Sequence, residues 1–391
     1  MKEATLLIKN VEVYTENDVI TSGYILVNGT DIVEIGIEEQ LEHIPSSVEV
    51  IDGKGKKAIP GFIDGHIHGA NGADVMDATP EALRAMATIL PKEGTTSFLA
   101  TTITQSPTNI EHALKNVATY RNEEGEAEII GVHLEGPFIE EKKAGAQPRE
   151  YILAPSKQQF DEWQQLSGNK IKTITLAPEK DVDGSFINYL YEQGVNVSAG
   201  HTEASFEDMK RAVEFGVRQV THICNAMTPI HHRDIGVVGA AFQLEKLRSE
   251  LISDGIHVSP AMMDLIYQNV GSDRLMLITD ALRAKCLQPG TYDLGGQEAT
   301  VSEDRATLAD GTLAGSILRL IDGAKNMIDY TDATMKQVIE MASTNPAKQL
   351  DVFDRKGTLA IGKDADIVVV DDELTIHYTI CRGKISYKEG S

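Results

Sequence analysis

Short apolar segments alternate with amphipathic segments through the middle of the chain. Each apolar segment has the length and flanking turn residues typical of a buried strand, and each amphipathic segment has the period of a helix. We predict eight strands, at residues 58–64, 96–101, 129–135, 171–177, 195–200, 219–224, 250–254 and 274–279. The intervening helices provide the crossovers that parallel pairing requires. The pattern therefore predicts an α/β fold whose strands close into a (β/α)8 TIM barrel.

The two ends of the chain follow a different pattern. Residues 1–57 and 355–391 contain short runs in which apolar and polar side chains alternate, separated by Gly and Asn turns. Such runs are typical of strands that are buried on one face only. We expect both ends to pair into one small β-sandwich domain, leaving residues 58–354 as the barrel domain.

One segment interrupts the regular alternation. Residues 283–312 follow the eighth predicted strand and resemble a β-hairpin insertion, because they are too long for a plain strand-to-helix loop. The hairpin is either a lid over a binding site or a structural flap.

Composition restricts the partners of the protein. The 391 residues include 36 Lys and Arg against 59 Asp and Glu, a formal net charge of −23. This field repels nucleic acids and anionic membrane surfaces, so a phosphorylated metabolite would need a local group of basic side chains. Cys224, Cys286 and Cys381 are far apart and are expected to be reduced thiols. No apolar run reaches the length of a membrane span, and we predict a cytoplasmic protein.

Metal-compatible side chains stand at the ends of five predicted strands. Catalytic groups of a TIM barrel lie at the carboxyl ends of its strands, where they converge on one volume. Imidazole and carboxylate together suit a borderline divalent ion such as zinc. The side chains that converge are His66, His68, Glu135, His201, His222 and Asp280.

The other histidines are interpreted differently. His133 shares the strand face of Glu135 but lies deeper, so we expect it to pack in the barrel or to support a ligand rather than to bind metal. His43, His112 and His377 stand in surface-like contexts.

Several short motifs carry a resemblance to a known family. The strand-end pattern resembles the amidohydrolase superfamily. Within it, the chain resembles the N-acetylglucosamine-6-phosphate deacetylases at HLEGPF (133–138), AGHT (199–202), TH (221–222), NAM (225–227), DGIH (254–257) and TDA (279–281). The resemblance runs nearly end to end. It implies a hydrolase that removes the N-acetyl group of N-acetyl-D-glucosamine 6-phosphate.

The resemblance also implies roles for the strand-end residues. Glu135, His201 and His222 would hold one divalent ion, and these ligands favour zinc. His66 and His68 would hold a second ion that Glu135 bridges, so one or two ions per subunit are implied. Asp280 would transfer protons, as base and then as acid.

Substrate contacts follow from the same resemblance. Arg233 and His257 are expected at the phosphate, supplied by the partner subunit of a homodimer. Gln147 stands where some members of the family carry His, which leaves its role open. The implied contacts with the amino-sugar phosphate are Ala146, Asn225, Ala226, Arg233, His257, Leu313, Ala314 and Gly315.

Two alternatives stay open at this point. Another metal-dependent amidohydrolase, a dihydroorotase-like or allantoinase-like cyclic amidase, would share the metal chemistry but not the GHT, NAM and DGIH motifs. A catalytically inactive barrel that serves as a scaffold should have lost some of the ligands.

Overall fold

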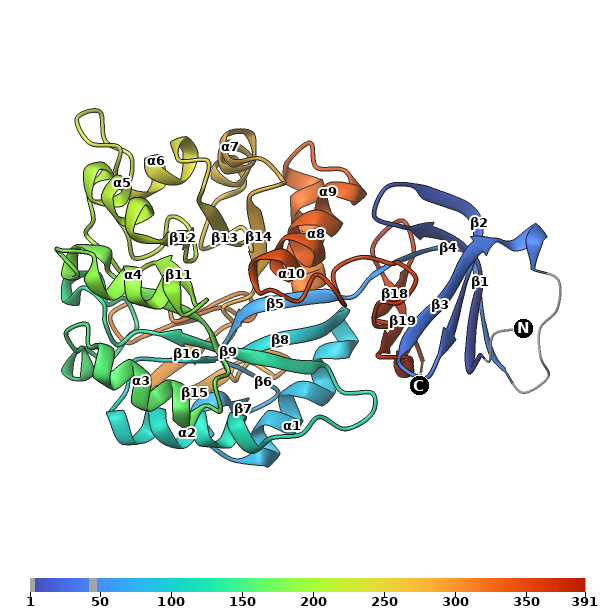
Figure 1. The fold of residues 1–391 in the computed structure, drawn as a ribbon, viewed down its shortest axis with the longest axis horizontal. Helices are drawn as coiled ribbons and strands as arrows, with labels where there is room; N and C mark the ends of the chain where they lie inside the picture. Colours follow the sequence, from blue (N-terminus) through green and yellow to red (C-terminus); the bar gives the residue numbers. More distant parts are fainter. Residues whose placement is uncertain (1–3, 42–47, 391) are drawn as a thin grey trace.

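A parallel barrel forms the body of the molecule (Figure 1). This computed structural model describes residues 4–41 and 48–390. The eight barrel strands pair in parallel in chain order. They are β5 (Phe62–Ile67), β8 (Thr95–Thr102), β9 (Glu128–Glu135), β10 (Ile171–Leu176), β11 (Asn196–Ala199), β12 (Val217–Val220), β13 (Arg248–Ile252) and β14 (Leu275–Ile278). The predicted TIM barrel is confirmed.

The barrel closes between its first and last strands. The Asp280 amide donates to the His66 carbonyl at 2.8 Å, and the His68 amide donates to the Ala281 carbonyl at 2.9 Å. These bonds join the ends of β5 and β14, where the predicted site residues lie. Closure therefore brings residues that are more than 200 positions apart into direct contact.

Helices cover the outside of the barrel (Figure 1). Local sequence sets their ends: at α1, for example, Pro80 occupies the first turn and the Thr79 side chain accepts from the Ala82 amide. Their apolar faces join the strands in one large core. The helices are α1 (Pro80–Ile89), α2 (Pro107–Thr119), α3 (Lys157–Leu166), α4 (Ser185–Glu192), α5 (Phe206–Phe215), α6 (Gly236–Gln243), α7 (Pro260–Val270), α8 (Leu320–Tyr330), α9 (Met335–Ile339) and α10 (Asn345–Gln349).

The chain ends form a second sheet beside the barrel (Figure 1). Its order is β20-β19-β18-β4-β1-β2-β3. The strands are β1 (Leu6–Tyr14), β2 (Val19–Asn28), β3 (Asp31–Ile37), β4 (Glu49–Pro60), β18 (Ile367–Val370), β19 (Ile376–Cys381) and β20 (Lys384–Lys388). The β2–β3 turn approaches the β19–β20 turn, because a Cβ added at Gly383 would lie 1.9 Å from the Gly29 carbonyl oxygen. The sheet thus folds over its own apolar core, as the sandwich prediction requires.

The boundaries of the two domains stay a prediction. Strand β4 runs through residue 57 to Pro60, so residues 58–60 pair with β18 in the terminal sheet and do not belong to the first barrel strand as predicted. The barrel strand begins at Phe62 instead.

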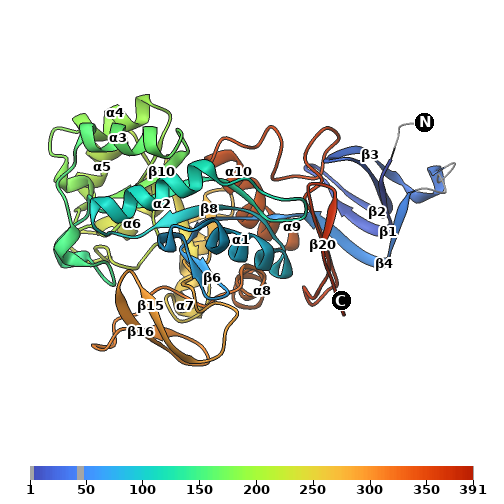
Figure 2. The ribbon, with the colours of Figure 1, turned by 90° about the horizontal axis from the view of Figure 1, so that it is seen from below.

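The predicted hairpin insertion is present and stands at the mouth of the barrel (Figure 2). Strands β15 (Gly290–Leu294), β16 (Gln297–Val301) and β17 (Ala306–Thr307) form an antiparallel sheet with its own small apolar core. A buried ion pair fixes its base, where Lys285 Nζ lies 2.5 Å from Glu93 Oε1. Two further short strands, β6 (Gly69–Ala70) and β7 (Ala73–Asp74), pair with each other near the end of β5.

Two further predictions are tested by the described residues. Cys224, Cys286 and Cys381 are all unpaired thiols. Within residues 4–41 and 48–390, no helix combines the length and apolar character that crossing a membrane requires.

Candidate active site

A pocket of about 350 Å³ opens at the carboxyl ends of the barrel strands. Most of the predicted site residues line it, although they come from the ends of six different strands and the loops beyond them. Those in the lining are His68, Glu135, Ala146, Asn225, Ala226, His201, His222, His257, Asp280, Leu313 and Gly315. The strand-end rule therefore located one common cavity.

Glu135 lies at the centre of the buried groups. Its Oε1 atom is 3.2 Å from the Nε2 atoms of both His201 and His222, and 3.4 Å from His66 Nε2. Its Oε2 atom is 3.2 Å from His68 Nε2. One carboxylate thus faces all four imidazoles.

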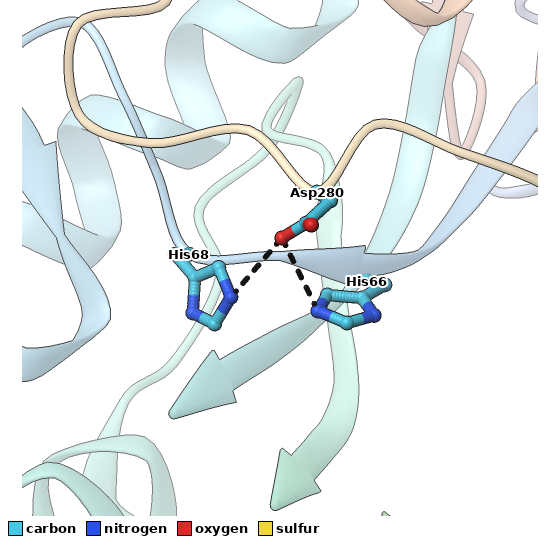
Figure 3. Close-up of side chains that lie close together, drawn as sticks. All are labelled: His66, His68 and Asp280. Atoms are coloured by element: carbon cyan, nitrogen blue, oxygen red, sulfur yellow. Dashed lines mark ion pairs between the residues drawn. The ribbon is translucent and has the colours of Figure 1, made fainter. Parts of the chain in front are cut away.

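Asp280 faces His66 and His68 across the junction between the first and last barrel strands (Figure 3). Its Oδ1 atom is 3.4 Å from His66 Nε2 and 3.2 Å from His68 Nε2. The histidines come from the end of β5, whereas Asp280 follows β14. The Asp280 side chain is 13% exposed, enough to reach a molecule in the pocket.

These side chains form two groups with the spacing of a metal site. His66, His68 and Asp280 form one group, and Glu135, His201 and His222 the other; in each, the ligand atoms lie within 4.8 Å of one another. His66 Nε2 is buried without a hydrogen bond among the described residues, although both carboxylates are 3.4 Å away. A cation between these atoms would satisfy them, so the residues fit a divalent metal.

Neighbouring groups orient the imidazoles. His201 Nδ1 lies 2.8 Å from the Lys143 carbonyl oxygen, which can only accept a hydrogen bond. The Nδ1 proton is thereby fixed, and Nε2 is left as the ligand atom toward Glu135. Gln147 serves Glu135 in a similar way, since its Nε2 atom donates to Glu135 Oε2 at 2.6 Å.

Burial and charge oppose each other at the carboxylates. Burial alone would raise the pKa of Glu135, but the neighbouring imidazoles hold that pKa well below its ordinary value. The same balance, against His66 and His68, lowers the pKa of Asp280 to about 2. The carboxylates raise the pKa of His66 despite its burial. The site therefore favours positive charge, and a bound metal ion would take the place of the histidine protons.

Three site residues adopt an unusual backbone conformation. The φ angles are 48° at His201, 30° at His222 and 48° at Asp280, in the left-handed region that non-glycine residues rarely enter. Strain of this kind collects at functional sites, where the surrounding structure imposes it. It also explains a correction: the sixth strand ends at Val220, and His222 lies in the turn beyond it rather than within the predicted strand.

His133 has both ring nitrogens engaged by the barrel. Nε2 lies 2.7 Å from Thr175 Oγ1, and Nδ1 lies 3.1 Å from the Gly65 carbonyl oxygen. Burial, together with the nearby His66, holds its pKa well below the ordinary value, which favours a neutral ring. This geometry agrees with a packing role for His133.

The remaining histidines differ in their exposure. His112 is exposed, as expected, whereas His377 is partly buried between Asp371 and Glu389. His43 lies outside the described residues.

Three predicted substrate contacts differ in how they relate to the pocket. Arg233 is exposed on the loop before α6 and contacts His232, outside the pocket of its own chain. His257 lines the pocket of its own chain and pairs with Asp254 at 2.6 Å, which corrects the expectation that a partner supplies it. The reason is that its loop follows β13 at the same barrel mouth. Ala314 is buried in the apolar core of the hairpin, between the lining residues Leu313 and Gly315.

Two buried carboxylates near the site were not predicted from the sequence. Asp64 accepts from Thr279 Oγ1 at 2.6 Å and so joins β5 to β14. Glu250 lies 3.0 Å from His66 Nδ1. Their signal was a charged residue within an otherwise apolar barrel strand, which is costly unless it is paired.

The fold and the site define the class of protein, and the chain belongs to the amidohydrolase family, whose profile matches residues 58–386. The chain is 45% identical over 387 residues to the N-acetylglucosamine-6-phosphate deacetylase of Bacillus subtilis, covering 98% of this chain and 97% of that protein. The predicted resemblance is confirmed.

Solved structures agree. The N-acetylglucosamine-6-phosphate deacetylase of Thermotoga maritima aligns with a TM-score of 0.87 at 31% identity, over 98% of this chain and 100% of that one. A mutant of the Mycobacterium smegmatis deacetylase, in complex with N-acetyl-D-glucosamine-6-phosphate, aligns with a TM-score of 0.90 at 26% identity, over 99% and 100% of the two chains.

Proposed function

We propose that this protein is an N-acetylglucosamine-6-phosphate deacetylase. Water would cleave the amide bond of N-acetyl-D-glucosamine 6-phosphate, giving D-glucosamine 6-phosphate and acetate. The observation that carries the proposal is the convergence of four histidines and two carboxylates at the barrel mouth, all but His66 in the lining of one pocket, in a chain 45% identical to such a deacetylase over 98% of its length.

The proposed cofactor is a divalent ion, with zinc favoured by the imidazole and carboxylate donors. Glu135, His201 and His222 would hold one ion, and His66 and His68 with Asp280 would hold a second. When bound, such an ion lowers the pKa of water and polarises the amide carbonyl.

Asp280 would move the protons of the reaction. The neighbouring imidazoles lower its pKa, which favours the ionised carboxylate, and this carboxylate borders the pocket. A carboxylate in this place accepts a proton from the attacking water and then delivers it to the departing amine. Gln147 and the Lys143 carbonyl keep Glu135 and His201 oriented meanwhile.

The substrate would extend from this centre across the pocket. Asn225, Ala226 and Ala146 line this pocket, together with Leu313 and Gly315 from the segment that follows the hairpin strands. We propose that His257 contacts the phosphate within the chain. Arg233 would reach the same phosphate from the second subunit of a homodimer, because a guanidinium fork matches phosphate oxygens. We also propose that the enzyme acts in the cytoplasm.

Comparison of two sugars tests the proposal. The purified chain should deacetylate N-acetylglucosamine 6-phosphate with a kcat/KM at least about 100-fold higher than that for N-acetylglucosamine, since each lost charge-assisted hydrogen bond costs about 1.5–3 kcal/mol. Both activities should fall when a chelator removes the metal and return with added zinc. Equal efficiency on the two sugars would refute the phosphate contacts.

The same assay addresses the alternatives. A cyclic amidase would open a cyclic amide such as dihydroorotate or allantoin and leave the acetamide intact. An inactive scaffold would cleave neither substrate. The complete set of buried metal-compatible side chains argues against the scaffold.

A further inference from the structure

Glu250 is a buried carboxylate that the proposed mechanism does not use. It lies on β13, is 2% exposed, and stands beneath the pocket rather than in its lining. A buried charge is costly unless several hydrogen bonds compensate for it. Its surroundings therefore indicate what it does.

Both carboxylate oxygens of Glu250 accept hydrogen bonds. Oε1 accepts from Gln219 Nε2 at 2.6 Å. Oε2 accepts from the His222 backbone amide at 3.3 Å and lies 3.0 Å from His66 Nδ1. Because carboxylate oxygens accept hydrogen bonds, His66 Nδ1 is the donor of this pair and carries the proton.

A chain of side chains through the barrel interior sets this direction. It begins at Arg248, whose guanidinium can only donate and which bonds to Gln349 Oε1. The Gln349 amide nitrogen then faces Asn196 Oδ1, and the Asn196 amide nitrogen donates to Gln219 Oε1 at 2.7 Å. Gln219 is left with only its amide nitrogen to offer to Glu250. None of the three side-chain amides in this series can rotate by about 180° without placing two donors or two acceptors opposite each other.

The other ring nitrogen of His66, Nε2, faces the carboxylates of the site. With the proton on Nδ1, the lone pair of Nε2 points toward Glu135 and Asp280, each 3.4 Å away. We propose that Glu250 is a positioning residue, which fixes the tautomer and ring orientation of His66 and thereby prepares the metal group of His66, His68 and Asp280. This inference rests on the metal centre of the proposed function.

Glu250→Gln tests the proposal without changing the size of the side chain. In one orientation the new amide nitrogen faces His66 Nδ1 and the His222 backbone amide, and in the other it faces Gln219 Nε2, so either orientation opposes two donors. In the orientation that keeps the bond from Gln219, the ring must accept at Nδ1 and carry its proton on Nε2, which removes the lone pair that would bind metal. The affinity of the His66 group for Zn²⁺ should fall about 10- to 100-fold, the usual effect of losing a partner of a metal-binding histidine.

Equilibrium dialysis of the full chain against graded Zn²⁺, followed by elemental analysis, measures this effect. The wild type should bind two ions, and Glu250→Gln should lose one of them while the ion at Glu135, His201 and His222 keeps its affinity. Glu214→Gln, which removes an exposed charge on α5, is the matched control and should bind as the wild type does.

A double variant isolates the hydrogen-bond direction. In Glu250→Gln with Gln219→Glu, the new carboxylate at 219 still accepts from Asn196 and also accepts from the new amide at 250. The amide oxygen at 250 is then turned toward His66 Nδ1, so the second ion should return to within a few-fold of its wild-type affinity. The total charge of the protein is unchanged by this exchange.

Several outcomes would overturn the proposal. One is that Glu250→Gln binds Zn²⁺ as the wild type does, or binds both ions equally weakly. Another is that the double variant binds the second ion as weakly as the single variant does. A third is that His66→Ala binds as many ions as the wild type. Each of these results would contradict the role of Glu250. Metal counts need no substrate. A chain that binds two ions as described but does not cleave the acetamide would contradict the proposed function and leave the role of Glu250 standing.

Discussion

Asp280 has a left-handed backbone conformation and a nearly buried carboxylate. The backbone turn at the end of β14 directs the side chain into the barrel mouth, beside His66 and His68 (Figure 3). Asparagine tolerates this backbone conformation almost as well as aspartate does. Asp280→Asn is therefore a variant that changes chemistry with little change in shape.

We expect Asp280→Asn to lower kcat by about 100- to 10,000-fold, the usual contribution of a proton-transferring group. Substrate affinity and the ion at Glu135, His201 and His222 should be retained, because Asp280 is not in that group. Steady-state kinetics with elemental analysis make the measurement, and Asp273→Asn at an exposed position is the control. Loss of both ions with the activity would assign Asp280 chiefly to metal binding.

At the scale of elements, the hairpin of β15 and β16 is attached to the loop that carries Ala146. Gln297 Nε2 donates to the Ala146 carbonyl at 2.6 Å, and Gln105 Nε2 donates to the Gly295 carbonyl at 3.0 Å. Leu294 of the hairpin lines the pocket. These bonds position the hairpin against the substrate loop. The sequence alone did not decide whether the hairpin is a lid or a structural flap.

Gln297→Leu should raise KM about 5-fold, because losing one net hydrogen bond of about 1 kcal/mol loosens the hairpin against the pocket. Thermal stability of the barrel should change little, since Gln297 belongs to the small separate sheet. Glu298→Ala, at the exposed neighbouring position, is the control. Identical KM values in the two variants would favour a flap without a role in binding.

At the scale of the whole molecule, the pocket of a single chain lacks Arg233. The resemblance of the chain to the deacetylases implies that this residue contacts the phosphate. A two-fold dimer would supply it twice, once to each pocket. Arg233→Ala and Asp280→Asn chains should each be nearly inactive alone. When they are mixed and exchanged, each mixed dimer would have one intact pocket, so about a quarter of wild-type activity should return.

The subunit-exchange experiment separates two arrangements. If Arg233 acts within its own chain, every pocket of a mixed dimer carries one defect, and mixing should restore nothing. Sedimentation measurements on the same samples report whether the dimer forms. A monomeric, fully active wild type would contradict the homodimer.

The sequence by itself determined the barrel, the terminal sheet and most of the site. Strand and helix periods are local properties, and the strand-end rule converts them into a shared location, which is how His201 and Asp280 could be assigned to one pocket. The sixth strand shows the limit of that reasoning: its end at Val220 depends on the turn that places His222 beside Glu135.

Only the tertiary structure decided the contacts between distant segments. Glu250 had no visible partner until closure of the barrel placed His66 beside it, and Gln147 acquired its role from a loop that folds back onto Glu135. His257 proved to line its own pocket, whereas Arg233 does not. The physical reason is that hydrogen-bond partners are fixed by loop conformation and barrel packing, which depend on the whole chain and leave no periodic trace in the sequence.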